Sequence, residues 1–103
     1  MAKIKDVTMS FPPSGSPDVV GYKLYVAEAP AEVTYESDSF DLGAETVVVL
    51  NTLPGMLDRD GVFNIGVVAV DDAGNESSMS LLNDVPLDFQ APEAPGPITI
   101  ERS

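Results

Sequence analysis

Apolar and polar side chains alternate along this chain with a period of two, over short runs that end at proline, glycine or acidic residues. The longest run covers residues 62–70, in which Phe63 and Ile65 share one face. Its opposite face is also apolar, at Val62 and Val68, which is typical of a strand in the middle of a sheet. No window of 11 or more residues has apolar side chains at helical spacing without a proline or glycine inside it. The sequence therefore predicts strands and no helix.

Shorter runs with the same alternation are expected to form the other strands. They cover residues 7–11, 22–26, 33–36, 46–50 and 82–89. The last run contains Pro86, which has no N–H to donate and is therefore expected at a sheet edge. The polar segment between residues 71 and 76 is expected to be a turn. Short strands that each bury one face favour an all-β fold, a two-sheet antiparallel β-sandwich.

The charge balance limits the partners that this chain can have. Its 103 residues include 17 acidic and 5 basic side chains, a net charge of −12. Such a charge repels phosphates and argues against binding to nucleic acid or to anionic membranes. We expect no membrane insertion, because no stretch approaches ~20 apolar residues. The first ten residues lack the apolar core of a signal peptide, and the sequence leaves the localisation open.

Two residue types that carry much of enzyme chemistry are missing. The sequence has no histidine and no cysteine, which excludes disulfides, thiol nucleophiles, Cys/His zinc sites and histidine bases. The serines at positions 77, 78 and 80 have no histidine to activate them, and no phosphate-binding glycine motif is present. We therefore expect a protein that is not an enzyme and has no cofactor.

Several segments together resemble a fibronectin type III domain of the bacterial variety, over residues 6–89. Residues 7–13 are similar to strand B of that family and residues 21–25 to strand C, while residues 50–55 resemble the end of strand E and the turn into F. The most specific match is residues 63–77, which resemble strand F and the F–G turn. The resemblance implies an immunoglobulin-like sandwich over residues 1–90, followed by a Pro-rich linker over residues 91–103.

The chain departs from the family pattern at three places. Phe11 stands where strand B usually has an inward tryptophan, and Phe63 occupies the tyrosine-corner position without its hydroxyl. Only residues 1–5 precede strand B, where the family has about ten residues. The resemblance therefore implies that strand A is short or missing.

The C-terminal segment offers a strand of its own, at Pro97, Ile98, Thr99 and Ile100. One interpretation is that a domain boundary has kept the first strand of a following domain. The other is a donor strand that fills the vacant strand A position on a neighbouring molecule, by adding to an open sheet edge. In the family, the last strand and strand A run in the same direction. A tail folded back on its own domain would therefore have the wrong direction.

Two further groups are candidate binding sites. Oxygen ligands for calcium lie near one expected pole of the sandwich, at Asp18, Asp71, Asp72, Asn75 and Glu76. The same residue types are ordinary in turns, which is the competing explanation. Tyr25 and Tyr35, on outward or peripheral positions, are candidates for a small aromatic patch that stacks on sugars. Tyrosines also lie half-exposed on many sheets without binding anything.

The resemblance and the missing catalytic residues favour one class of function. They imply a non-catalytic structural or protein-interaction module of a bacterial or phage surface or extracellular protein. Its partner would be a protein, including a second copy of itself through strand exchange, and the location would be secreted or at the cell surface. The alternative is a carbohydrate- or calcium-binding accessory module of a secreted enzyme.

Overall fold

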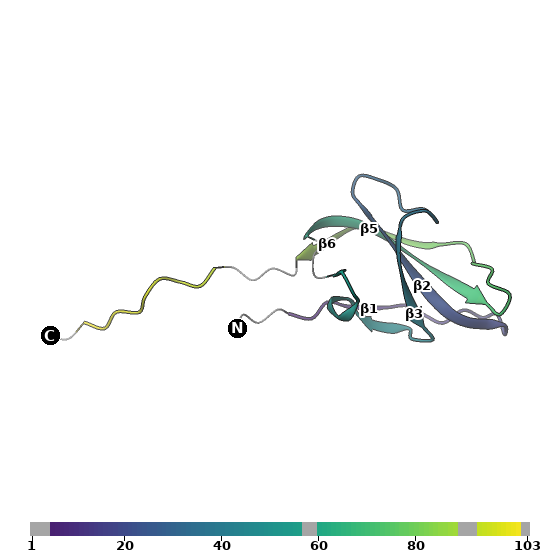
Figure 1. The fold of residues 1–103 in the computed structure, drawn as a ribbon, viewed down its shortest axis with the longest axis horizontal. Helices are drawn as coiled ribbons and strands as arrows, with labels where there is room; N and C mark the ends of the chain where they lie inside the picture. Colours follow the sequence, from purple (N-terminus) through teal and green to yellow (C-terminus); the bar gives the residue numbers. More distant parts are fainter. Residues whose placement is uncertain (1–4, 57–59, 89–92, 102–103) are drawn as a thin grey trace.

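The strands form two antiparallel sheets in a computed structural model that describes residues 5–56, 60–88 and 93–101 (Figure 1). The larger sheet has the order β3-β2-β5-β6. Its strands are β2 (Val19–Glu28), β3 (Asp38–Gly43), β5 (Asp60–Asp71) and β6 (Ser80–Asp88). The smaller sheet pairs β1 (Thr8–Ser10) with β4 (Val47–Val49). The prediction of an all-β chain with two antiparallel sheets is confirmed, in an arrangement consistent with a sandwich.

The core lies between the two sheets and follows the alternation of the sequence. On β2, the inward side chains Tyr22, Leu24 and Val26 are all buried. Other strands and the turn after β4 complete the buried cluster, with Leu42, Val48, Leu50, Met56, Phe63, Ile65 and Leu87. Phe11 packs edge-on against Tyr22, with 5.0 Å between ring centroids. The period of two therefore decides which side chains of these strands face the space between the two sheets.

The positions of β5 and β6 in the sheet agree with their sequences. β5 has β2 on one side and β6 on the other, as expected for a run that is apolar on both faces. β6 is one of the two edge strands that the described residues form in this sheet, and its Pro86 pairs with Val62. A proline is compatible with this position because an edge strand has one side without ladder bonds.

The expected strand over residues 33–36 is wrong, and the structure has β3 in its place at Asp38–Gly43. β3 pairs with β2 and places Phe40 opposite Leu24. Its Leu42 is buried although Asp38, Ser39 and Asp41 precede it in the same strand. The expected strand over residues 46–50 is also shorter, because Leu50 begins the 3-10 turn η1 (Leu50–Thr52). Among the described residues, no helix is long or apolar enough to cross a membrane.

The outer face of the larger sheet is covered by two connections between strands. Asn64 of β5 ties the connection before β3 to the sheet, because its Nδ2 donates to the carbonyl of Ala31 (2.8 Å). Its Oδ1 accepts from the N–H of Asp84 in β6 (3.0 Å). Gly66 lies beneath the side chain of Met79, and a Cβ at this glycine would come within 2.2 Å of the methionine sulfur. The segment before β3 and the segment before β6 thus form a second layer on this face.

Candidate functional site

An apolar groove opens along the side of the molecule where β1 and β6 face each other. Its volume is about 120 Å³. The lining residues come from β1 and the residue after it, from β5 and from β6, and they include no charged side chain: Met9, Ser10, Phe11, Ile65, Val67, Ser80, Leu81 and Leu82. We call this groove the seam. It lies where two sheet edges meet, and within the described residues no third strand extends the smaller sheet beyond β1.

Leu82 shows that the seam is an uncovered part of the core. It pairs directly with Ile65, so both side chains lie on the inward face of the larger sheet. Ile65 is only 5% exposed, whereas Leu82 is 60% exposed. The smaller sheet has two strands and does not extend far enough to cover Leu82. An inward-facing leucine therefore remains at the surface.

The outer edge of β1 presents backbone groups as well as apolar side chains. On its inner edge, the N–H of Leu50 donates to the carbonyl of Val7 (2.8 Å) and the N–H of Phe11 donates to that of Thr46 (3.0 Å). Antiparallel pairing alternates the direction of these groups along a strand. The N–H and C=O of Thr8 and Ser10 therefore point away from β4, toward the seam side. Such an edge is able to pair with an added strand.

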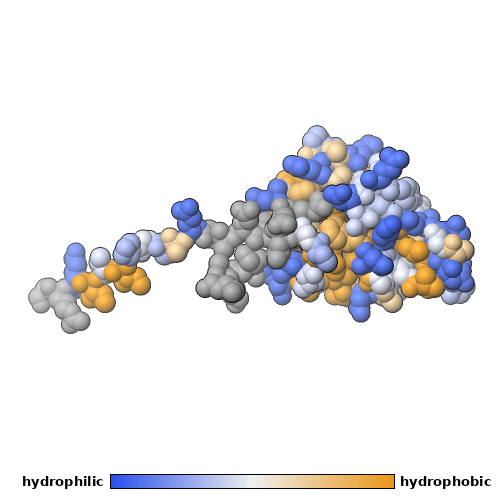
Figure 2. All heavy atoms as spheres, in the orientation of Figure 1, coloured by the Kyte–Doolittle hydropathy of each residue, from blue (hydrophilic) through white to orange (hydrophobic). Residues whose placement is uncertain are grey.

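The C-terminal segment does not cover this edge. Residues 93–101 are all exposed and contain no regular secondary structure. They lead away from the sandwich in Figure 1, and the orange side chains on them in Figure 2 are apolar. Ile98 is 91% exposed, more than any other large apolar side chain among the described residues. The candidate donor residues Pro97, Ile98, Thr99 and Ile100 therefore lie apart from the seam of their own molecule.

Four of the five candidate calcium ligands line one hollow of about 240 Å³: Asp18, Asp71, Asn75 and Glu76. Asp72 is not part of that lining. The carboxylate of Asp71 already accepts from the N–H of Ala73 (3.0 Å), the N–H of Asn75 (2.8 Å) and the Asn75 side chain (3.1 Å). These bonds, that of the Asn75 N–H above all, lower the pKa of Asp71 below its ordinary value. Asp71 thus has an evident role in closing the turn between β5 and β6.

Glu76 also has partners within the protein. It accepts a hydrogen bond from the hydroxyl of Tyr25, and its other oxygen lies 3.8 Å from Nζ of Lys23. Among the described residues, no three histidine, cysteine, aspartate or glutamate side chains are grouped closely enough to hold a metal ion. The calcium site stays a prediction, and it would have to recruit carboxylates that already make other bonds.

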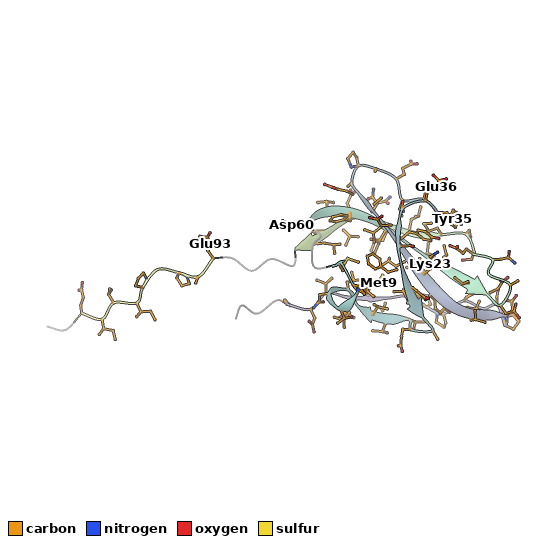
Figure 3. All side chains as sticks on the ribbon, in the orientation of Figure 1. Met9, Lys23, Tyr35, Glu36, Asp60 and Glu93 are labelled. Atoms are coloured by element: carbon orange, nitrogen blue, oxygen red, sulfur yellow. The ribbon has the colours of Figure 1, made fainter. Side chains whose placement is uncertain are left out.

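The two candidate aromatic residues are in contact, but only one of them is exposed. The rings of Tyr25 and Tyr35 meet edge-on at 5.8 Å between centroids. Tyr35 is exposed and donates a hydrogen bond to the carbonyl of Ser77 (2.7 Å), whereas Tyr25 beneath it is 2% exposed. Figure 3 labels Tyr35 and Lys23, which belong to this cluster. The expected patch of two outward rings is therefore corrected to a single accessible ring.

The cluster around Tyr25 is polar as well as aromatic. Lys23 Nζ lies 5.3 Å from the centre of the Tyr25 ring, within the range of a cation–π contact. The hydrogen bond to Glu76, together with burial, raises the pKa of Tyr25 above its ordinary value. The hydrogen bond with Tyr25 and the charge of Glu76 raise the pKa of Lys23. These contacts hold the second layer on the sheet and indicate a structural role.

The residues that line the seam were not identified from the sequence. The sequence pattern places Met9 and Phe11 on one face of the run over residues 7–11 and places Leu82 only in the expected last strand. A signal was nevertheless present in the family resemblance, which implies that strand A is short or missing. An absent strand would leave inward side chains of its neighbours uncovered, and the alternation of β6 makes Leu82 one of them.

No family model, curated protein or solved structure matches this chain.

Proposed function

We propose that this chain is a non-catalytic structural or protein-interaction module that binds an extended protein strand in the seam between β1 and β6. The observation that carries this proposal is the exposure of Leu82 on the inward face of the larger sheet. A side chain in that position needs a neighbour from the opposite layer. A strand added beside β1 would supply it and would also pair with the outer backbone groups of that strand.

We also propose that the fold of this chain is of the fibronectin type III type. The segments that resemble strands B, C, E and F overlap or adjoin β1, β2, β4 and β5, respectively. Strand A would lie next to β1, where the seam opens. The proposal places the module in a bacterial or phage surface or extracellular protein, which rests on the resemblance alone.

The chemistry of the seam defines the class of partner. Its lining is uncharged, so charged side chains would lose hydration there without finding an opposite charge. A suitable ligand is extended, with apolar side chains at alternate positions and backbone groups open on one edge. Each fully buried aliphatic side chain contributes about 1.5–3 kcal/mol, against about 1–2 kcal/mol to order each residue. We therefore expect modest affinity, suited to a tethered or repeated partner.

The other classes have less support from the described residues. The sequence contains neither histidine nor cysteine, and its serines lack a histidine base. One exposed tyrosine ring offers little area for stacking a sugar, because its neighbour Tyr25 is buried. Binding of a strand is the function for which the structure offers both a groove and unpaired edge groups.

The test is titration with a short synthetic peptide of alternating isoleucine and threonine, followed by methyl NMR. The full-length I98K variant is the receptor, so that its own tail does not compete. Shifts at the methyl groups of Met9 and Leu82, absent with a peptide of alternating aspartate and threonine, are the expected result. If neither methyl group responds at saturating peptide, the seam does not bind strands and the proposal fails.

A further inference from the structure

We propose that the strand bound in the seam is residues 97–101 of a second copy of this chain, an inference that rests on the proposed strand-binding function. The molecule exposes both parts of such an interface. The seam leaves Leu82 without a covering layer, and the C-terminal segment leaves Ile98 almost fully exposed. The seam lacks a strand that would cover it and pair with β1. The C-terminal segment lacks an apolar surface that would bury its isoleucines.

The charge of the two surfaces favours this occupant. The chain as a whole carries −12, yet Pro97, Ile98, Thr99 and Ile100 are uncharged, and so is the lining of the seam. A basic partner would be drawn to the acidic faces of the sandwich and not to this groove. The uncharged segment of the chain itself fits the uncharged groove, with the acidic residues of both copies left in solvent.

The direction of the strands indicates that the donor is another molecule. Phe11 and Pro12 lie beside Ser78 and Ser80, so the end of β1 adjoins the start of β6 and the two strands run in opposite directions. A strand paired antiparallel with β1 must therefore run in the same direction as β6. The tail leaves its own molecule at the opposite end of the seam, where β6 ends.

To pair antiparallel with β1 of its own molecule, the tail would have to turn back, run the length of β6 and turn again. β6 is eight residue steps long from Ser80 to Asp88, about 26 Å at ~3.3 Å per step. Nine steps join Asp88 to Pro97 and reach about 28 Å at ~3.1 Å per step, so the return alone would use the connection and leave no residues for the two turns. A tail folded straight back would run parallel to β1, which is the less stable pairing. Figure 1 shows residues 93–101 leading away from the sandwich, as a donor requires.

One register matches the apolar side chains of both partners. Ile98 and Ile100 would point to the same face of an extended strand, as Met9 of β1 and Phe11 just after it do. Antiparallel pairing that sets Ile98 opposite Phe11 also sets Ile100 opposite Met9. Both isoleucines then enter the seam and lie against Leu82. The alternative register, shifted by one residue, would turn them to solvent.

The same register completes the hydrogen bonding of β1. It sets Thr99 opposite Ser10 and Glu101 opposite Thr8. These two β1 residues are the ones whose N–H and C=O point toward the seam side. Directly opposed residues of this kind exchange two hydrogen bonds in an antiparallel pair. The outward side chains of Thr99 and Glu101 remain in solvent, where a carboxylate is stable.

The resulting contact is heterologous, because the tail of one copy meets the seam of the next. Such contacts build head-to-tail chains, or rings where the geometry closes. We expect mass in solution to rise with protein concentration. Because both partners are acidic, added salt should strengthen the association by screening their repulsion.

The test uses two full-length variants that each remove one part of the interface. I98K removes the donor and keeps the seam, and L82K removes the seam and keeps the donor. Each alone should remain a monomer in sedimentation velocity at concentrations where the parent chain assembles. An equimolar mixture should form a dimer and nothing larger, because one intact tail meets one intact seam. Lysine makes the chain less acidic, so a loss of assembly cannot come from added repulsion.

Two matched variants act as controls. T99K changes the neighbouring tail residue, whose side chain points outward in the proposed pairing. V47K changes a residue of β4 whose side chain is as exposed as that of Leu82. Both should assemble like the parent chain. The inference is overturned if the parent chain stays monomeric at every concentration, or if I98K assembles as well as T99K.

These outcomes separate the inference from the proposed function. If the alternating peptide shifts the resonances of Met9 and Leu82 while the parent chain remains a monomer, the seam binds strands and the tail is not its ligand. If the parent chain assembles but L82K assembles equally well, the contact lies elsewhere and both the inference and the seam as its site are wrong.

Discussion

Tyr25 and Leu82 depart from the alternation of their strands in opposite ways. Tyr25 points away from the core of the sandwich and is nevertheless buried, because Tyr35 and the segment after β5 lie over it. Leu82 points toward the core and is nevertheless 60% exposed. The position of a residue in the alternation therefore decides which face of the sheet its side chain is on. Whether the side chain is buried depends on the layer that covers that face. One face of this small domain has an additional layer and one edge lacks a layer.

Substitutions of Tyr25 and Leu82 are expected to differ most in their effect on the free energy of unfolding. Y25A removes a buried ring and the second layer around it, so we expect the free energy of unfolding to fall by about 3 kcal/mol. L82A removes an exposed side chain from the monomer and should cost about 0.5 kcal/mol. Chemical denaturation of dilute protein measures both. Equal losses for the two variants would mean that the seam is closed in solution.

A smaller effect is expected from the Tyr25 hydroxyl alone. Y25F leaves the Glu76 carboxylate without its donor and should lower stability by about 1 kcal/mol near neutral pH. Because the folded state raises the pKa of Tyr25, this contribution is present below the unfolded value of about 10 and is lost as pH rises through the folded value. Thermal melts across alkaline pH should therefore fall less steeply in Y25F. The exposed-ring variant Y35F is the control and should retain the alkaline slope of the parent chain.

The turn between β5 and β6 should respond to acid. The folded state lowers the pKa of Asp71, so its contribution is complete above the unfolded value near 4 and is lost as pH falls through the folded value. D71N should lower the melting temperature at neutral pH and flatten its fall in acid. D72N changes the charge equally, at a residue whose backbone N–H donates to the carbonyl of Asp18, outside the turn. If the two variants behave alike, the bonds to Asp71 do not matter.

The smallest expected effect is that of calcium. Asp71 and Glu76 are already bonded within the protein, so we expect the melting temperature to be the same in calcium and in chelator. A rise in calcium that D18N and D72N both abolish would instead establish a metal site at this pole.

The sequence predicted the parts of the fold that depend on local alternation. β5, the inward faces of β1 and β2, and the edge position of Pro86 all followed from side-chain period and proline chemistry. β3 was missed because Asp38, Ser39 and Asp41 make it read as polar, although the pairing of Phe40 with Leu24 secures it in the sheet. Pairing with a neighbour outweighed local propensity there.

The candidate site required the arrangement of the two sheets. The family resemblance implied a short or missing first strand, and the alternation at Ile98 and Ile100 indicated a strand-like C-terminal segment. The residues that face the gap were not, because exposure of Leu82 depends on how far the smaller sheet extends over the larger one. Burial of Tyr25 depends in the same way on the path of the connection before β3. Both the exposure of Leu82 and the burial of Tyr25 depend on segments that are distant in the sequence, and the local alternation gives no information about them.

Amide hydrogen exchange along β1 tests most directly whether a strand from another copy occupies the seam. Phe11 already donates to Thr46 within the molecule, whereas the N–H of Ser10 points to the outer edge. We predict that the protection of Ser10 increases with concentration in the parent chain and not in I98K, while that of Phe11 stays constant. If Ser10 exchanges at the same rate in dilute and concentrated parent protein, no strand is added at this edge.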